Sequence, residues 1–180
     1  MSIPVPDNST YRLVRCTETD AAETVEWITR TYHFDPDEVA AWVRDLHFNW
    51  PLSVKALDAD GATIGLLNMS DYRIEQETPT ILTAAPSLWR QLDAMHYTAV
   101  FSFIVSEPYR HTILNHAMIS SIYDVLCQYD FLYVPVMHRL LTHRYWKRRG
   151  AVEFYRDDET VHYLIPFSDQ ARRLAATLTT

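Results

Sequence analysis

One stretch of the chain, residues 97–129, combines a long apolar segment, a proline and an amphipathic pattern. Residues 97–105 (Tyr-Thr-Ala-Val-Phe-Ser-Phe-Ile-Val) have the β-branched and aromatic composition of a buried strand. Pro108 cannot continue inside a sheet, because it has no backbone N–H to donate. Apolar residues then recur at helical spacing, at Leu114, Met118, Ile122, Val125 and Tyr129. The stretch predicts a strand, a tight loop and a helix in succession.

The loop of residues 107–115 is the first candidate for a ligand site. Backbone amides at the start of a helix have no partner inside the helix and lie at its positive end, which suits a phosphate or a carboxylate. Arg110 and His111 add side-chain donors there. Such amides occur wherever a strand leads into a helix, and most of them bind only water. The loop by itself therefore does not identify a ligand.

Composition and charge limit the class of protein. The chain has 180 residues, of which 48% are hydrophobic and 22% charged, so we expect one globular domain over residues 1–180. The net charge of -7 argues against a general nucleic-acid binder. Cys16 and Cys127 match no metal-ligand spacing and indicate reduced thiols. With no secretion signal and no run approaching the roughly 20 apolar residues of a membrane span, we expect a cytoplasmic protein without a membrane segment.

The remaining elements follow from hydrophobic period and capping signals. Asp20 and Asp35 are placed to cap two helices, and Pro36 suits the first position of the second helix. Pro135 indicates that its strand lies at an edge or is distorted. In chain order we expect a strand at 11–15, helices beginning after Asp20 and at Pro36, and a hairpin of 52–56 and 64–69. These are followed by the strand, loop and helix of 97–129, a strand at 131–136, a short basic helix over 138–149 that Gly150 ends, and a hairpin of 152–154 and 161–165.

Two segments fall outside this pattern. Residues 72–95 have no clear period, contain two prolines and allow one short helix at 87–92. We interpret them as an insertion between the third and fourth strands, which either shapes a substrate mouth or an interface or is only a surface excursion. Residues 168–180 form a C-terminal tail, in which Ser168 or Asp169 can cap a terminal helix.

The order of elements over residues 11–167 resembles the GNAT superfamily of N-acetyltransferases, and similarity at the level of motifs begins at residue 97. The resemblance implies an α/β (α+β) fold with a mixed, mostly antiparallel sheet of about seven strands flanked by helices. It also implies that the fourth and fifth strands splay apart.

The resemblance places the coenzyme at the central loop. In that family the fourth strand ends in a valine-like residue, and five residues later begins the pattern Arg or Gln, any, any, Gly, any, Gly or Ala, whose amides hold the pyrophosphate of coenzyme A. Val105 and Arg110 match this spacing, but Ile113 and Asn115 replace the small residues. A β-branched side chain at the point of closest approach obstructs the pyrophosphate or displaces it. The residues implied for acetyl-CoA are Ile104, Val105, Arg110, His111, Thr112, Ile113, Leu114 and Asn115.

The segment 145–151 (Tyr-Trp-Lys-Arg-Arg-Gly-Ala) is similar to the family's aromatic and charged segment after the fifth strand. The family often places a tyrosine, its general acid, four residues before the glycine, and Trp146 occupies that position here. An indole cannot protonate a leaving thiolate as a phenol does, so either Tyr145 takes the role through a shifted register or no such acid exists. Candidates for the base that deprotonates the amine are Glu107, His96 and His162.

Metal and nucleic-acid sites are weaker hypotheses. His111 and His116 are five residues apart, as are His138 and His143, so neither pair has the helical spacing of metal ligands and we expect no metal. The basic residues within 138–149 are able to contact phosphate or nucleic acid, but such a run is more often a solvated face. We therefore treat a nucleic-acid partner as the third hypothesis.

Two main function classes remain. The first is a GNAT-like acyltransferase that moves an acetyl group from acetyl-CoA to the amine of a small molecule or a protein. The second is a catalytically inactive GNAT-fold protein with an interaction or structural role in a homo-oligomer or larger assembly, favoured by the missing loop glycines and by Trp146. Residues 150–154 (Gly-Ala-Val-Glu-Phe) are loosely similar to phage-encoded, virion-associated relatives, which keeps that origin open.

Overall fold

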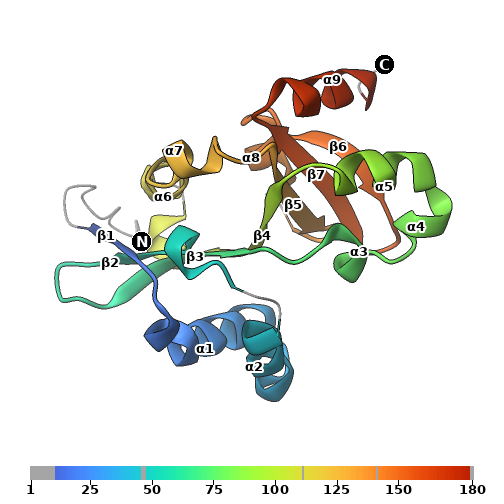
Figure 1. The fold of residues 1–180 in the computed structure, drawn as a ribbon. Helices are drawn as coiled ribbons and strands as arrows, with labels where there is room; N and C mark the ends of the chain where they lie inside the picture. The colour runs from blue at the N-terminus through green and yellow to red at the C-terminus, as the bar shows by residue number, and fades with distance from the viewer. Residues whose placement is uncertain (1–10, 46–47, 111, 141, 179–180) are drawn as a thin grey trace. The chain divides into compact units, whose positions relative to one another are not determined.

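The computed structural model describes residues 11–45, 48–110, 112–140 and 142–178 (Figure 1). The strands are β1 (Arg12–Arg15), β2 (Val54–Leu57), β3 (Thr63–Ser70), β4 (Tyr97–Val105), β5 (Phe131–Met137), β6 (Val152–Arg156) and β7 (Thr160–Pro166). The α-helices are α1 (Ala21–Tyr32), α2 (Pro36–Asp45), α3 (Ile74–Glu77), α4 (Ile81–Ala84), α5 (Pro86–Asp93), α6 (Leu114–Ser120), α7 (Tyr123–Leu126), α8 (His143–Lys147) and α9 (Asp169–Leu178). Short 3-10 turns are η1 (Glu18–Asp20), η2 (Trp50–Leu52) and η3 (Glu107–Tyr109).

The strands form one seven-stranded sheet in the order β1-β2-β3-β4-β5-β7-β6. The pairings β1–β2, β2–β3, β5–β7 and β6–β7 are antiparallel, whereas β4 and β5 are parallel. The sheet is therefore mixed and mostly antiparallel, as predicted. The parallel register pairs residues 97–99 with residues 131–133, so the described pairing joins β4 and β5 only where both strands begin.

Close contacts divide the chain into two compact units, each made of two segments. Unit 1 comprises residues 1–70 and 101–123, and unit 2 comprises residues 71–100 and 124–180. The chain passes from one unit to the other within β4. The assignment of residues 1–180 to one domain with an insertion at 72–95 stays a prediction.

Unit 1 is built on α1 and α2, which begin where predicted. The prediction that Asp20 caps α1 is wrong, because its carboxylate instead accepts from the Thr17 amide (2.7 Å) and pairs with Lys55 (2.6 Å). The Asp35 carboxylate accepts hydrogen bonds from the backbone amides of Asp37 (2.9 Å) and Glu38 (3.2 Å), and Pro36 is the first residue of α2. The apolar faces of the two helices are buried together with residues of β3 and β4. This core contains Cys16, Trp27, Ile28, Val39, Val43, Phe48, Leu66 and Ile104.

Gly65 of β3 fixes how closely α6 packs on unit 1. A Cβ atom at this position would lie 3.1 Å from Met118 Sδ and 3.5 Å from Val105 Cγ2. The absence of a side chain therefore lets α6 lie directly against the strand.

The helix predicted to continue to Tyr129 is interrupted. α6 ends at Ser120, and α7 begins at Tyr123. At the interruption the Ser121 hydroxyl donates to the backbone oxygen of Met118 (2.7 Å), and Arg15 donates to the backbone oxygen of Ser121 (2.7 Å). At this turn side chains compete with backbone amides for the backbone oxygens. Hydrophobic spacing in the sequence does not reveal such bonds.

In unit 2, residues 72–95 are more ordered than their sequence suggests. The predicted helix at 87–92 corresponds to α5, but α3 and α4 were not predicted, because four-residue helices leave no periodic pattern. Arg73 forms an ion pair with Asp93, and the amide of Ile74 donates to the Tyr97 hydroxyl (2.8 Å). These bonds tie the segment to itself and to β4.

Pro135 lies in β5, an internal strand, so the prediction of a sheet edge is wrong for the strand as a whole. It is right locally, because the described pairing with β4 ends at Tyr133 while the pairing with β7 continues to Met137. The terminal hairpin and the terminal helix α9 form as expected. Of the helices in the described ranges, none is long and apolar enough to cross a membrane.

Candidate functional site

The loop between β4 and α6 is a series of tight turns within unit 1. The amide of Ser106 donates to the backbone oxygen of Ile64 in β3 (2.9 Å), so the loop begins anchored to the sheet. The amides of Tyr109, Arg110 and Thr112 then donate to backbone oxygens three residues earlier. Pro108 lies inside η3, where its missing N–H removes no sheet bond.

Arg110 connects the loop to the end of β4. Its Nε donates to the backbone oxygen of Val105, 3.1 Å away. A guanidinium carries five N–H groups, so this bond leaves the two terminal nitrogens for other acceptors. The arginine that the resemblance assigns to the pyrophosphate is thus oriented by the strand end.

Thr112 stabilises the start of α6. Its hydroxyl donates to the backbone oxygen of Tyr109 (2.8 Å) and accepts from the amide of Leu114 (3.2 Å). The sequence prediction assigned Thr112 to the coenzyme, and the structure shows both bonds directed into the loop itself. A threonine two residues before the helix is the signal that points to this role.

Ile113 does not strain the loop. Its backbone is right-handed (φ -65°, ψ -11°), and the described residues with positive φ are His33, Gly61 and Gly150. The loop therefore needs no glycine conformation at Ile113. The Ile113 side chain is 51% exposed, so it lies at the surface of the loop, where a ligand would approach. The backbone at Ile113 is therefore unstrained, and the exposed side chain occupies the position where the family pattern has a glycine.

Three of the predicted coenzyme residues belong to the core of unit 1. Ile104, Val105 and Leu114 are 4%, 7% and 0% exposed. Only their backbone groups are therefore placed to meet a ligand. Asn115 is half-buried in α6, and His111 lies outside the described residues.

The candidate bases differ in exposure. Glu107 is exposed in the first turn of η3. His96 is exposed in unit 2, where its ring stacks on Tyr129. His162 is fully buried in unit 2 and hydrogen-bonded through both ring nitrogens, to Tyr133 (2.7 Å) and Asp157 (2.9 Å). The structure thus leaves Glu107 and His96 in contact with solvent and removes His162 from it.

The two aromatic candidates for the general acid, both in the segment after β5, differ in burial. Trp146 is 3% exposed and anchors α8 in unit 2, whereas Tyr145 is half-buried. The Arg149 guanidinium lies 3.9 Å from the centre of the Tyr145 ring. Burial raises the pKa of Tyr145 to about 12, and the positive charge of Arg149 opposes that rise. The Tyr145 phenol therefore stays protonated at neutral pH.

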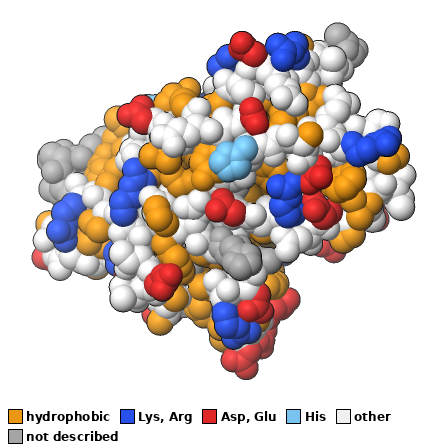
Figure 2. All heavy atoms as spheres, in the orientation of Figure 1, with side chains coloured by type: hydrophobic (Ala, Val, Ile, Leu, Met, Phe, Trp, Pro, Cys, Tyr) orange, Lys and Arg blue, Asp and Glu red, His pale blue; other side chains and the backbone are white. Residues whose placement is uncertain are grey.

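Charged side chains of the two signs are interspersed on the face shown in Figure 2. The basic run predicted as a helix over 138–149 forms α8 only at His143–Lys147. Within the described ranges, no group of three or more His, Cys, Asp and Glu side chains is arranged to hold a metal ion.

Comparison with known proteins identifies the fold through solved structures. No family model and no curated protein matches the chain. Solved structures do match, among them apo FdhC, described as a nucleotide-linked sugar GNAT, with 17% identity, coverage of 94% of this chain and 93% of that chain, and a TM-score of 0.55. A GNAT-family acetyltransferase from Staphylococcus aureus matches with 11% identity, coverage of 88% and 99%, and a TM-score of 0.61. PaiA N-acetyltransferase from Thermoplasma acidophilum, in complex with coenzyme A, matches with 9% identity, coverage of 87% and 99%, and a TM-score of 0.56.

This chain has the GNAT fold. The prediction from the order of elements is confirmed, and the matches extend over most of the chain. At these identities the likeness concerns the fold alone. The features that sequence reasoning missed are the bond from Arg110 to the Val105 oxygen and the bond from the Leu114 amide to the Thr112 hydroxyl.

Proposed function

We propose that this protein transfers an acetyl group from acetyl-CoA to an amine. The observation that carries the proposal is the connection from β4 to α6, in which Arg110 follows Val105 at the family spacing and is hydrogen-bonded to it. The chain has the GNAT fold, and the solved structures that share it include acetyltransferases and a complex with coenzyme A. The acceptor is the amine of a small molecule or a protein.

The coenzyme would be held mainly by backbone groups. The amides of Thr112 and Leu114 already donate within the loop. The amide of Ile113 and the terminal nitrogens of Arg110 would therefore bind the pyrophosphate, because charged hydrogen bonds to phosphate are strong and directional. Backbone groups of Ile104 and Val105 would orient the pantetheine arm beside the strand. When bound, the coenzyme supplies the thioester that the amine attacks.

Two side chains would move the protons. Glu107, exposed at the start of the loop, would accept a proton from the incoming amine, which must be neutral to attack a carbonyl. Tyr145, protonated at neutral pH, would donate a proton to the sulfur as the carbon–sulfur bond breaks. The transfer thereby yields an amide and a free thiol.

Titration calorimetry with acetyl-CoA is the direct test. We expect binding in the micromolar range, followed by release of free thiol when a panel of amines is supplied. Absence of heat at millimolar acetyl-CoA would contradict the proposal. Desulfo-CoA, which keeps the pyrophosphate and lacks the thiol, should bind with similar affinity.

The second candidate is a GNAT-fold protein with an interaction role and no catalysis. Burial of Trp146 at the family's acid position and exposure of Ile113 at the first glycine position favour it. It predicts no thiol release with any amine, and light scattering should then show an oligomer or a stable complex. Turnover above the uncatalysed rate would exclude it.

A further inference from the structure

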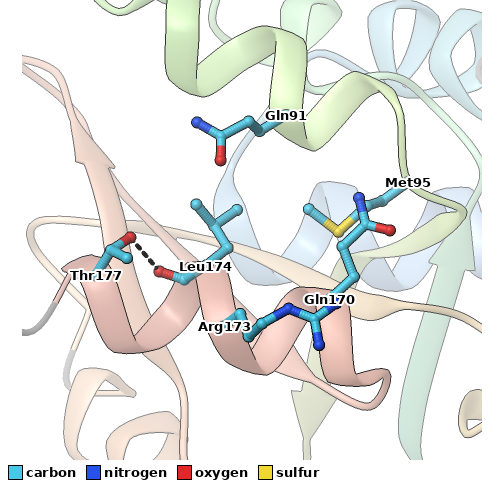
Figure 3. Close-up of a pocket in the computed structure, with 6 residues that line it drawn as sticks. All are labelled: Gln91, Met95, Gln170, Arg173, Leu174 and Thr177. Atoms are coloured by element: carbon cyan, nitrogen blue, oxygen red, sulfur yellow. Dashed lines mark hydrogen bonds between the residues drawn. The ribbon is translucent and has the colours of Figure 1, made fainter.

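A small hollow lies between α5 and α9 in unit 2 (Figure 3). Its volume is about 210 Å³, and it is lined by Gln91, Met95, Gln170, Arg173, Leu174 and Thr177. The two helices come from residues 72–95 and from the C-terminal tail, the segments that the sequence marks as additions to the family pattern. The hollow is therefore a feature of this chain rather than of the central loop.

The floor of the hollow is apolar. Met95 and Leu174 are 4% and 7% exposed, so their side chains are already withdrawn from bulk water. Gln91 extends from α5 toward Leu174 of α9 (Figure 3). The Thr177 hydroxyl donates to the backbone oxygen of Leu174 (2.7 Å), so this donor is already used. The floor suits a hydrocarbon group rather than a polar one.

The rim of the hollow carries hydrogen-bond donors and one positive charge. Gln91, Gln170 and Arg173 supply carboxamide and guanidinium N–H groups. The described lining includes no acidic side chain. Charge complementarity at this rim therefore favours an anion over a cation.

Nearby acidic side chains are bonded to other arginines. On α9, Asp169 pairs with Arg172 (2.9 Å), and at the end of α5, Asp93 pairs with Arg73. Among the described residues, Arg173 has no ion pair. Adjacent arginines on one helix thus differ, because Arg172 is paired and Arg173 is not.

We propose that the hollow between α5 and α9 binds a small organic monocarboxylate with a ring-sized apolar group. The apolar group contacts Met95 and Leu174, and the carboxylate is bound by Arg173 with the carboxamides of Gln91 and Gln170. A planar guanidinium matches a carboxylate through two parallel N–H bonds. A cavity of about 150 Å³ holds benzene, so the volume here admits a ring and a carboxylate.

Benzoate is the probe. Its binding is measured by titration into the ¹⁵N-labelled full chain, with amide chemical shifts recorded in ¹H–¹⁵N correlation spectra. We expect saturable shifts confined to α5 and α9, with a dissociation constant in the millimolar range. Benzyl alcohol, similar in size and uncharged, should bind at least about 10-fold more weakly, because it gains no charged hydrogen bond. Absence of saturable shifts, or equal binding of benzyl alcohol, would overturn the proposal.

Arg173→Gln and Arg172→Gln form a matched pair for the site. Both replace one exposed arginine of α9, and equal melting temperatures will show that both variants fold. We expect Arg173→Gln to weaken benzoate binding about 10-fold or more and Arg172→Gln to leave it unchanged. An equal effect of the two changes would show attraction by general positive charge and would overturn the site. Acetyl-CoA binding should be unaltered in both variants.

Discussion

Nε of Arg110 lies 3.1 Å from the backbone oxygen of Val105 and donates a hydrogen bond to it. The bond links the last residue of β4 to the loop. Arg110 therefore stabilises the conformation of the loop and also places a positive charge there. A lysine would keep the charge but lose the planar fork that makes this bond while offering further donors. The two contributions are therefore separable by substitution.

Replacement of Arg110 tests the coenzyme site. We expect Arg110→Ala to weaken acetyl-CoA binding about 10- to 100-fold, the effect of losing hydrogen bonds from a charged group. Arg110→Lys should recover only part of the affinity. Calorimetric titration measures both variants, with Arg30→Ala on α1 as a control that leaves affinity unchanged. Full affinity in Arg110→Ala would remove this arginine from the site.

Replacement of Tyr145 tests the proposed general acid. Tyr145→Phe keeps the ring beside Arg149 and removes the phenol hydroxyl, the proposed proton donor, so we expect kcat to fall about 100-fold or more with little change in acetyl-CoA affinity. Tyr155→Phe, which removes the hydroxyl bonded to Thr80 in the same unit, is the matched control. Equal rates for wild type and Tyr145→Phe would mean that another group or solvent protonates the sulfur.

Gly65 provides a test of the packing beneath the loop. Because an added Cβ would lie 3.1 Å from Met118 Sδ, we expect Gly65→Val to lower the free energy of unfolding by about 1–3 kcal/mol, measured by urea denaturation. Gly65→Ala should cost less, since the flexible Met118 side chain is able to move. If Gly65→Val matched wild type in stability, α6 would have to pack less closely than the structure shows.

Acid should destabilise unit 2 through His162. Burial lowers the pKa of His162 below its ordinary 6.5, although Asp157 opposes the shift, and His138 adds to it. In the unfolded chain His162 binds a proton near pH 6.5, whereas in the folded chain it stays neutral at that pH. The free energy of unfolding therefore falls as pH drops below 6.5 toward the folded pKa. Burial would raise the pKa of Asp157, but its bonds to His162 and to backbone amides outweigh burial and lower the pKa from 3.8 to about 2. The free energy of unfolding therefore falls a second time as pH drops from about 3.8 to about 2.

Urea denaturation at pH 7.5 and pH 5.5 measures this effect. Wild type should be less stable at pH 5.5, and His162→Gln, which has no ring to protonate, should show a smaller difference between the two pH values. His96→Gln, a change at an exposed histidine of the same unit, should behave as wild type. An unchanged difference in His162→Gln would exclude His162 as the source.

The sequence predicted those parts of the fold that have periodic or capping signals. The cap at Asp35, the hairpins and the strand at 97–105 are local patterns, and their order was enough to indicate the GNAT fold. The short helices α3 and α4 were missed because four residues show no period. At the break before Tyr123, the Ser121 oxygen accepts from Arg15, which lies 106 residues away in the sequence, and no local pattern contains such a contact.

The candidate site was less predictable than the fold. The resemblance to the family pattern after the fourth strand identified Arg110, but its bond to Val105 depends on the turn geometry of η3. The sequence raised Ile113 as an obstruction, and only the backbone angles show that the loop accepts it without strain. Burial distinguished Trp146 from Tyr145, because neighbouring aromatic residues look alike until the core is known.

The interleaving of the two units has a consequence for synthesis. Unit 1 requires residues 101–123, and unit 2 requires residues 124–180, so neither unit is a continuous fragment of the chain. During synthesis the core of unit 1 cannot form when only α1, α2 and the first hairpin have left the ribosome. It also requires the second half of β4 and α6, which are made later. The apolar face of β3 is exposed during that wait, so we expect truncation anywhere before residue 123 to yield aggregates rather than a folded N-terminal half.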